Sequence, residues 1–186
     1  NKSKTYAEKA AWDFINSDEC NMELSVINPS LVLGPVLESD FGTSVELVKR
    51  FLNGGFPLAP NISFGIVDVR DVAQLHLLAL ESPQASGNRF IASSETLAIP
   101  LISEFLRKKI PEYQKRLPKG TAPDFLIKLL GFFSPLMKTV ANQLGKTKEL
   151  DNSKAKNILG WQPRSGEEAV IASAKSLIEF DIVKSP

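Results

Sequence analysis

The sequence predicts an α/β protein, and three features support this fold class. Three short β-rich segments, 23–28, 66–71 and 88–92, end at turn or helix-capping residues. Apolar residues with helical spacing occupy the intervals before and between these segments. After Ser94 the pattern becomes mostly helical and is interrupted by prolines, which predicts a smaller second lobe.

The first predicted helix covers residues 3–15 and leads through a polar connection, residues 16–21, into the first strand. This strand is apolar and stops at Pro29, as a buried parallel strand that runs into a loop does. Residues 29–35 are therefore predicted to form a loop.

Two further helices are predicted from their capping residues. Thr43 and Glu46 have the spacing of a capping box, and Gly54 ends the helix that they begin. Asp71 follows the strand 66–71 as a predicted cap of the next helix.

The second half is predicted to be mostly helical. A capping box at Ser165 and Glu168 begins the last helix, and Gly160 closes the one before it. The other helices are expected over 99–109, 123–130, 135–144 and 153–159.

The composition is that of one packed domain. The chain has 186 residues, of which 43% are hydrophobic and 23% charged, and its formal charge is +1. No basic stripe with interleaved aromatic residues occurs, so nucleic acid is not expected as a partner.

The single cysteine, Cys20, excludes an internal disulfide, and the single histidine, His76, cannot form a zinc cluster with it. These features, and the lack of a visible signal peptide, favour a reducing cytoplasm. The apolar region 125–137 is too short to span a bilayer, so no membrane partner is expected.

Four separated stretches resemble, in the right order, one branch of the extended short-chain dehydrogenases/reductases. The branch is that of dihydroflavonol reductase, cinnamoyl-CoA reductase and aldehyde reductase. The stretches are Ser3-Lys4-Thr5 with Ala7 to Trp12, Ile27-Asn28-Pro29 with Val32 to Pro35, Val67 to Ala73, and Asp151 to Lys154 with Leu159-Gly160-Trp161.

The resemblance implies the second half of a doubly wound Rossmann-type parallel sheet with a smaller helical substrate lobe. It implies three parts: residues 1–94 from the dinucleotide-binding domain, 95–150 as the substrate lobe, and 151–186 as helices that pack back on the domain. The family's Gly-x-Gly-x-x-Gly fingerprint does not occur in this sequence. We therefore expect only the nicotinamide end of the site here.

Lys4 matches the lysine of the family's Tyr-x-x-x-Lys motif, and the tyrosine is expected immediately before Asn1. Residues four apart share a helix face, so an ammonium group there can lower the pKa of a phenol that is near 10 when free. The resemblance also implies that Lys4 binds the nicotinamide ribose. Tyr6 does not fit the catalytic role, because the residue four later is Ala10.

Three further residues are implied to contact the cofactor, which is expected to be NADP or NAD. Pro29 and Val32 match loop residues whose backbone meets the nicotinamide carboxamide. Ser44 matches a residue near the phosphates, and its place at a helix N-terminus would attract anions.

Several other residues that could suggest chemistry have a structural interpretation. Asp68, Arg70 and Asp71 are expected to form a cap and a surface ion pair, and His76 to be a hydrogen-bonded helix residue. An apolar cluster surrounds Gly131 and Pro135, and three roles are open for it: a wall or lid of a substrate pocket, core packing, or a patch that faces a partner. The members of this cluster are Phe125, Leu126, Leu129, Leu130, Phe132, Phe133, Leu136 and Met137. Phe41 is a further candidate for substrate contact.

The leading hypothesis is an NAD(P)-dependent oxidoreductase that acts on a small-molecule carbonyl substrate, present here as a fragment without activity of its own. A sugar-nucleotide epimerase or dehydratase of the same superfamily is the alternative within enzymes. A non-catalytic assembly module that binds a separate N-terminal half is the alternative outside them, and a homodimer is also possible.

Overall fold

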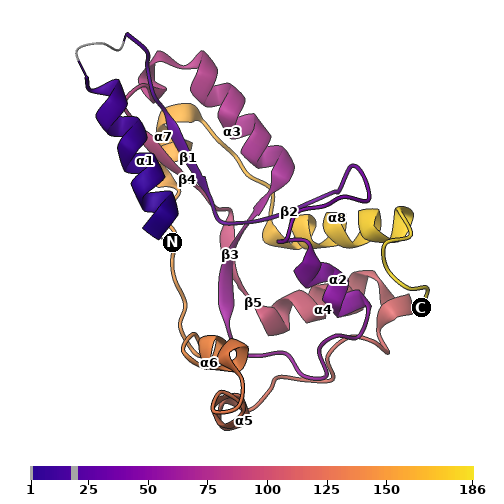
Figure 1. The fold of residues 1–186 in the computed structure, drawn as a ribbon. Coiled ribbons are helices and arrows are strands. Elements are labelled where there is room, and N and C mark those ends of the chain that lie inside the picture. The colour runs from indigo at the N-terminus through magenta and orange to yellow at the C-terminus, as the bar shows by residue number, and fades with distance from the viewer. Residues whose placement is uncertain (1, 18–20) are drawn as a thin grey trace.

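The computed structural model describes residues 2–17 and 21–186. Cys20 and part of the predicted connection over 16–21 lie outside the described residues. The described chain alternates strands and helices over its first hundred residues and is mainly helical afterwards, as Figure 1 shows. The predicted α/β class is therefore confirmed.

The strands form two small sheets. The strands are β1 (Val26–Pro29), β2 (Leu31–Leu33), β3 (Ser63–Asp68), β4 (Arg89–Ala92) and β5 (Glu95–Ala98). β1 pairs in parallel with β4, and their last residues, Pro29 and Ala92, are register partners. β2 pairs in parallel with β3, and β5 runs antiparallel on the other edge of β3.

Helices cover both sides of the β1–β4 pair, with α1 and α3 on opposite sides of it in Figure 1. The helices are α1 (Lys2–Ile15), α2 (Glu46–Leu52), α3 (Val69–Glu81), α4 (Ile99–Lys109), α5 (Asp124–Leu130), α6 (Pro135–Ala141), α7 (Ser153–Leu159) and α8 (Gly166–Glu179). Short 3-10 turns occur as η1 (Pro83–Ala85) and η2 (Pro111–Tyr113).

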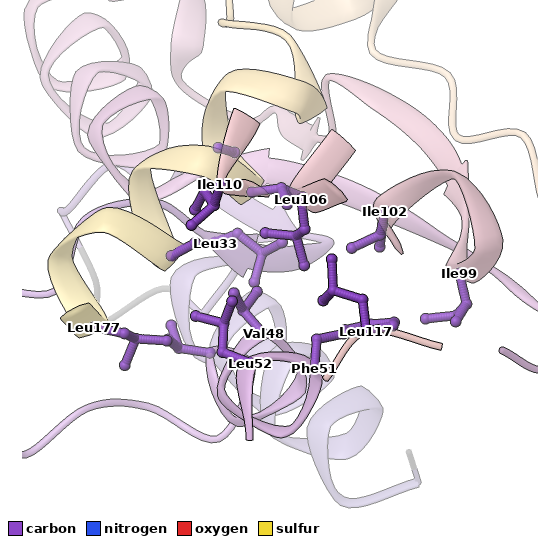
Figure 2. Packing of buried hydrophobic residues seen from close by; sticks show 14 of the residues in the cluster. Leu33, Val48, Phe51, Leu52, Ile99, Ile102, Leu106, Ile110, Leu117 and Leu177 are labelled. Atoms are coloured by element: carbon purple, nitrogen blue, oxygen red, sulfur yellow. The ribbon is translucent and has the colours of Figure 1, made fainter. Parts of the chain in front are cut away.

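The larger core cluster lies between β2, α2, α4 and α8. Leu33, Val48, Ile102, Leu106 and Leu177 meet there, as Figure 2 shows. All five side chains are almost completely withdrawn from solvent. Burial of such aliphatic side chains contributes about 1.5–3 kcal/mol each, so this cluster holds the β2–β3 sheet against the three helices.

The smaller core cluster lies on one face of the β1–β4 pair. Phe90 of β4, Leu75 of α3 and Ala155 of α7 pack around the completely buried Trp161. The indole Nε1 of Trp161 donates a hydrogen bond of 2.9 Å to the carbonyl oxygen of Asp71. This bond satisfies the polar group of a buried aromatic residue and joins the start of α3 to the segment after α7.

Most sequence predictions of helices are confirmed. The predicted helix 99–109 has the bounds of α4, and Ser165 and Glu168 form the predicted capping box of α8. Gly160 ends α7 in the left-handed region with φ 64°, which a glycine adopts without strain.

Three predictions about local structure are wrong, and the strand β5 is not among the predicted elements. The predicted loop 29–35 contains β2, and β5 lies in the second half, which the sequence predicts to be mostly helical. α2 begins at Glu46 without a side-chain cap from Thr43, because residues 42–45 form a turn of their own. The N-cap of α3 is Asp68, whose carboxylate accepts from the Arg70 N–H, and Asp71 lies inside the helix.

The segment from α5 to α6 is the most exposed apolar part of the described chain. Phe132 and Phe133 are 85% and 83% exposed, and Phe125 is exposed as well. A core position for these three side chains is therefore excluded. The division of the chain at residues 94 and 150 stays a prediction.

Candidate functional site

The loop that follows β2 is built around Gly34, whose φ of +117° is unfavourable for residues with a side chain. A Cβ atom at this position would lie 2.9 Å from Oδ1 of Asp68 and 3.0 Å from Cγ1 of Val69. The loop therefore approaches the junction of β3 and α3 as closely as only glycine allows.

Two serines of α8 hold this loop in place. Ser173 Oγ accepts a hydrogen bond of 2.7 Å from the Gly34 N–H, and Ser176 Oγ accepts one of 2.9 Å from the Val36 N–H. Both serines are buried, so these bonds form away from competing water. A helix more than a hundred residues away in sequence thus fixes the backbone after β2.

Asp68 and Arg70 form a bidentate ion pair at the junction of β3 and α3, next to the loop after β2. Arg70 Nε and Nη2 donate to the two carboxylate oxygens of Asp68 at 2.9 and 2.8 Å. The hydrogen bond to Asp68 raises the pKa of Arg70 above its ordinary value, although partial burial acts in the opposite direction. The expected cap and ion pair are thus confirmed for Asp68 and Arg70, with Asp68 buried rather than at the surface.

Asp71 has a structural partner of its own. Its carboxylate accepts a hydrogen bond of 2.7 Å from the Arg164 N–H and forms an ion pair with the Arg164 guanidinium. His76 is exposed on α3, and its Nδ1 lies 2.8 Å from the carbonyl oxygen of Val72. Both residues are therefore engaged in structure, as expected from the sequence.

A cavity of about 340 Å³ lies over the loop after β2. Val32, Gly34, Phe41 and Ser44 are among the residues that line it. Two of the four predicted site residues, Val32 and Ser44, are therefore brought to one cavity. Phe41 lines it too, with the ammonium of Lys49 5.1 Å from its ring centroid.

Pro29 does not line this cavity; it is the exposed last residue of β1. The next residue, Ser30, donates its N–H to the carbonyl oxygen of Ala92 at 2.9 Å, which ties the end of β1 to the end of β4. Pro29 thus lies at the carboxyl edge of two parallel strands, where open α/β sheets bind ligands.

Lys4 is exposed on α1, which is joined to β4 by an ion pair of 2.7 Å between Glu8 and Arg89. Figure 1 shows the N-terminal end of α1 pointing toward the end of β1 at which Pro29 lies. Lys4 is not a lining residue of the cavity, and its role in the site stays a prediction.

Ser44 lies in the turn before α2 rather than at its first residue. Its carbonyl oxygen accepts from the Leu47 N–H at 3.3 Å, and Glu46 places a carboxylate in the first turn of the helix. Ser44 thus lies one residue before the N-cap of α2, close to the expected helix N-terminus, and the attraction of an anion to it stays a prediction. Its contact with the cofactor stays a prediction.

Sequence reasoning missed several polar residues at the site. Ser173 and Ser176 share the buried face of α8 with Val170 and Leu177, and serine at core-facing helical positions could have indicated them. Ser30 and Ser93, which follow β1 and β4, were also missed, because nothing in a single sequence distinguishes them from loop serines.

Among the described residues there is no group of three or more histidine, cysteine, aspartate or glutamate side chains that could hold a metal ion. None of the described helices combines the length and apolar character that crossing a membrane requires.

Comparison with known proteins gives the family. The chain is 31% identical over 187 residues to the NADPH-dependent methylglyoxal reductase Gre2 of Saccharomyces cerevisiae, covering 96% of this chain and 50% of that protein. It is 35% identical over 188 residues to the ketoreductase azaE of Aspergillus niger, covering 95% and 50%. The chain belongs to the extended short-chain dehydrogenases/reductases.

The fold comparison agrees with this family. The crystal structure of yeast methylglyoxal/isovaleraldehyde reductase Gre2 complexed with NADPH superposes with a TM-score of 0.75 and 29% identity, over 97% of this chain and 51% of that one. The Rossmann-type fold expected from the sequence is thus confirmed. No family model matches the chain. The chain spans about half the length of the relatives that it matches.

Proposed function

We propose that the protein carrying this chain is an NADPH-dependent oxidoreductase that reduces the carbonyl group of an aldehyde or ketone. The observation that carries this proposal is the cavity over the loop after β2, at the carboxyl side of parallel strands, in a chain related to NADPH-dependent reductases. When bound, NADPH supplies the hydride that reaches the carbonyl carbon.

The residues at this edge fit the nicotinamide end of the cofactor. Val32 and Gly34 both line the cavity, and Val32 offers an apolar wall to a planar ring. Pro29 presents its backbone at the edge of the β1–β4 pair. In this proposal Pro29 and Val32 orient the ring, and Ser44 contacts the cofactor farther along the cavity.

Lys4 has the acid–base role in the proposal. Its ammonium binds the ribose hydroxyls and lowers the pKa of the tyrosine expected one helical turn before it, so that this phenol gives its proton to the carbonyl oxygen. The exposure of Lys4 on α1 is consistent with this role.

The test is steady-state turnover of NADPH by the full-length protein with aldehydes. Lys4→Ala is expected to lower kcat by about 100-fold or more, in the range of acid–base catalysis. Lys9→Ala is the matched control, because Lys9 is an equally exposed lysine of the same helix, and it should leave kcat unchanged. Equal activity of Lys4→Ala and the wild type would refute the role of Lys4. Conversion of a nucleotide sugar without net NADPH consumption would favour an epimerase instead.

The 186-residue chain by itself is expected to consume NADPH no faster than a control without enzyme. The reason is that its 186 residues contain no glycine-rich phosphate-binding turn of the type Gly-x-Gly-x-x-Gly. Aldehyde-dependent NADPH oxidation by this purified chain would contradict this expectation.

A further inference from the structure

A helical hairpin, made of α5, the turn 131–134 and α6, carries the most exposed apolar side chains of the second half of the described chain. Phe125, Phe132 and Phe133 are 72%, 85% and 83% exposed, and Leu129 of the same hairpin is also exposed. Figure 1 shows α5 and α6 together at one end of the molecule, away from α1 and α3. A cluster of exposed large apolar side chains marks a surface that contacts a partner.

The inner side of the hairpin is attached to the protein, which leaves the phenylalanines outside. Ile127 of α5 is buried, and Val140 of α6 packs against the larger core cluster. At Gly131 the two helices approach closely, since a Cβ atom there would lie 3.1 Å from the carbonyl oxygen of Lys128 and 3.3 Å from Cα of Lys138. This approach closes the hairpin, and the two phenylalanines that follow Gly131 project into solvent.

The hairpin and the segment after it are basic. Residues 125–148 contain four lysines and no aspartate or glutamate, although the formal charge of the whole chain is only +1. The four residues, Lys128, Lys138, Lys146 and Lys148, are all exposed. Within the described part of the chain none of them belongs to an ion pair. Positive charge and exposed aromatic rings therefore occur on the same part of the surface.

A hollow of about 780 Å³ lies on this hairpin. Lys128 and Lys138 line it together with Phe132 and Phe133. Because both rings are largely exposed, the hollow does not enclose a small molecule as a ligand pocket does. Lysines beside projecting aromatic rings match a partner that has an anionic layer over an apolar one.

An acidic peptide is the other partner that these charges could attract. A peptide helix that binds in a groove needs apolar contacts spaced along the groove. The two most exposed rings of the hairpin are instead adjacent residues of one turn. Such a tip suits insertion into a lipid layer better than contact with a helix.

We propose that this hairpin docks the protein on the surface of a bilayer that contains anionic phospholipids. Phe132 and Phe133 insert below the headgroups, while Lys128 and Lys138 pair with the anionic groups. The region 125–137 is too short to span a bilayer, but surface contact needs no spanning segment, so the expectation of no membrane partner is revised to this extent. The proposal is independent of the reductase function, because none of these four residues lines the cavity over the loop after β2.

The test is cosedimentation of the full-length protein with vesicles made of equal amounts of phosphatidylserine and phosphatidylcholine. The wild type should bind them, bind vesicles of phosphatidylcholine alone about 10-fold more weakly or less, and be released by high salt. Phe132→Ala should weaken binding about 10-fold and Lys138→Ala about 5-fold. Leu80→Ala and Lys175→Ala are the matched controls, because these residues are equally exposed on α3 and α8, and both variants should bind as the wild type does.

A second measurement keeps the test decisive if a variant changes stability. Phe132→Trp retains a ring at the tip, and vesicles with brominated acyl chains should quench the fluorescence that this substitution adds. Absence of binding, equal binding to the two kinds of vesicle, an equal loss in the controls, or no quenching overturns the proposal. Binding of polyglutamate without binding of vesicles also overturns it, and shows that the hairpin contacts an acidic protein instead.

Discussion

α1 and α8 are both helices of 14 residues, yet they relate to the rest of the protein in opposite ways. α8 buries seven residues against the larger core and has a capping box, whereas none of the residues of α1 is buried. α1 is joined to the sheet by the exposed ion pair between Glu8 and Arg89. An isolated helix of this length is only marginally stable in water and needs tertiary packing. The buried residues of α8 provide that packing, whereas α1 has no buried residue to provide it.

The difference separates stability from the proposed chemistry. α8 supplies Ser173 and Ser176, which position the loop after β2, while α1 supplies Lys4, which is proposed to act on the ligand. Substitutions of buried residues in α8 should therefore change the free energy of unfolding, whereas substitution of Lys4 in α1 should change activity with little effect on stability. The predictions below test this division, beginning with the largest expected effect.

Leu177→Ala is expected to lower the free energy of unfolding by about 2–5 kcal/mol, because the side chain is fully buried and its removal leaves a cavity in the larger core. Phe14→Ala in α1, where the side chain is exposed, should change it by less than about 0.5 kcal/mol. Urea unfolding followed by circular dichroism measures both. Similar losses for the two variants would show that α1 is packed as firmly as α8.

Ser173→Ala should cost about 1–3 kcal/mol, because the Gly34 N–H would be left buried without its acceptor. The same variant should weaken NADPH binding by the full-length protein, since the loop after β2 lines the proposed cofactor cavity. Lys175→Ala, an exposed position of the same helix, is the control for both measurements. A loss of stability with unchanged NADPH affinity would separate the loop from the cofactor.

Ser165→Ala should destabilise the protein by about 1 kcal/mol, because it removes the N-cap of α8. Ser165→Gly should cost only a few tenths of a kcal/mol, since glycine is also accepted at this position. The midpoints of thermal unfolding of the two variants check this order. If glycine were the worse substitution, the hydroxyl would not be the source of the stabilisation.

Glu8→Gln is expected to have the smallest effect, less than about 1 kcal/mol, because its partner Arg89 is largely exposed. High salt should reduce the difference between this variant and the wild type, since it screens exposed charges. Amide hydrogen exchange should find α1 less protected than α8 in both proteins. Strong protection of α1 that persists in high salt would mean that another contact holds it.

Helices that are marked by apolar periodicity and capping residues can be predicted from the sequence. The short strands β2 and β5 cannot. α4 and the capped start of α8 follow from periodicity and capping residues within a few positions. β2 and β5 have three and four residues, and both exist because they pair with β3, which is distant from β2 in sequence. Long-range pairing overrides the local turn signals around them.

The candidate site shows the same limit. The resemblance to family positions assigns Val32 to the nicotinamide and Ser44 to the phosphates of the cofactor, and the structure brings both residues to one cavity. Asp71 has the residue type of a cap, yet Asp68 takes that role because it stands at the last position of β3. Ser30 and Ser93 become neighbours through the register of β1 and β4, which a single sequence does not reveal.

The bonds from Ser173 and Ser176 to the loop at Gly34 and Val36 have a consequence for biosynthesis. The ribosome adds about 5–20 residues per second, so the loop emerges several seconds before the helix that holds it. During that interval the N–H groups of Gly34 and Val36 lack their serine partners and are bound by water instead. In a nascent chain the loop after β2 thus reaches its final position only after α8 has been made.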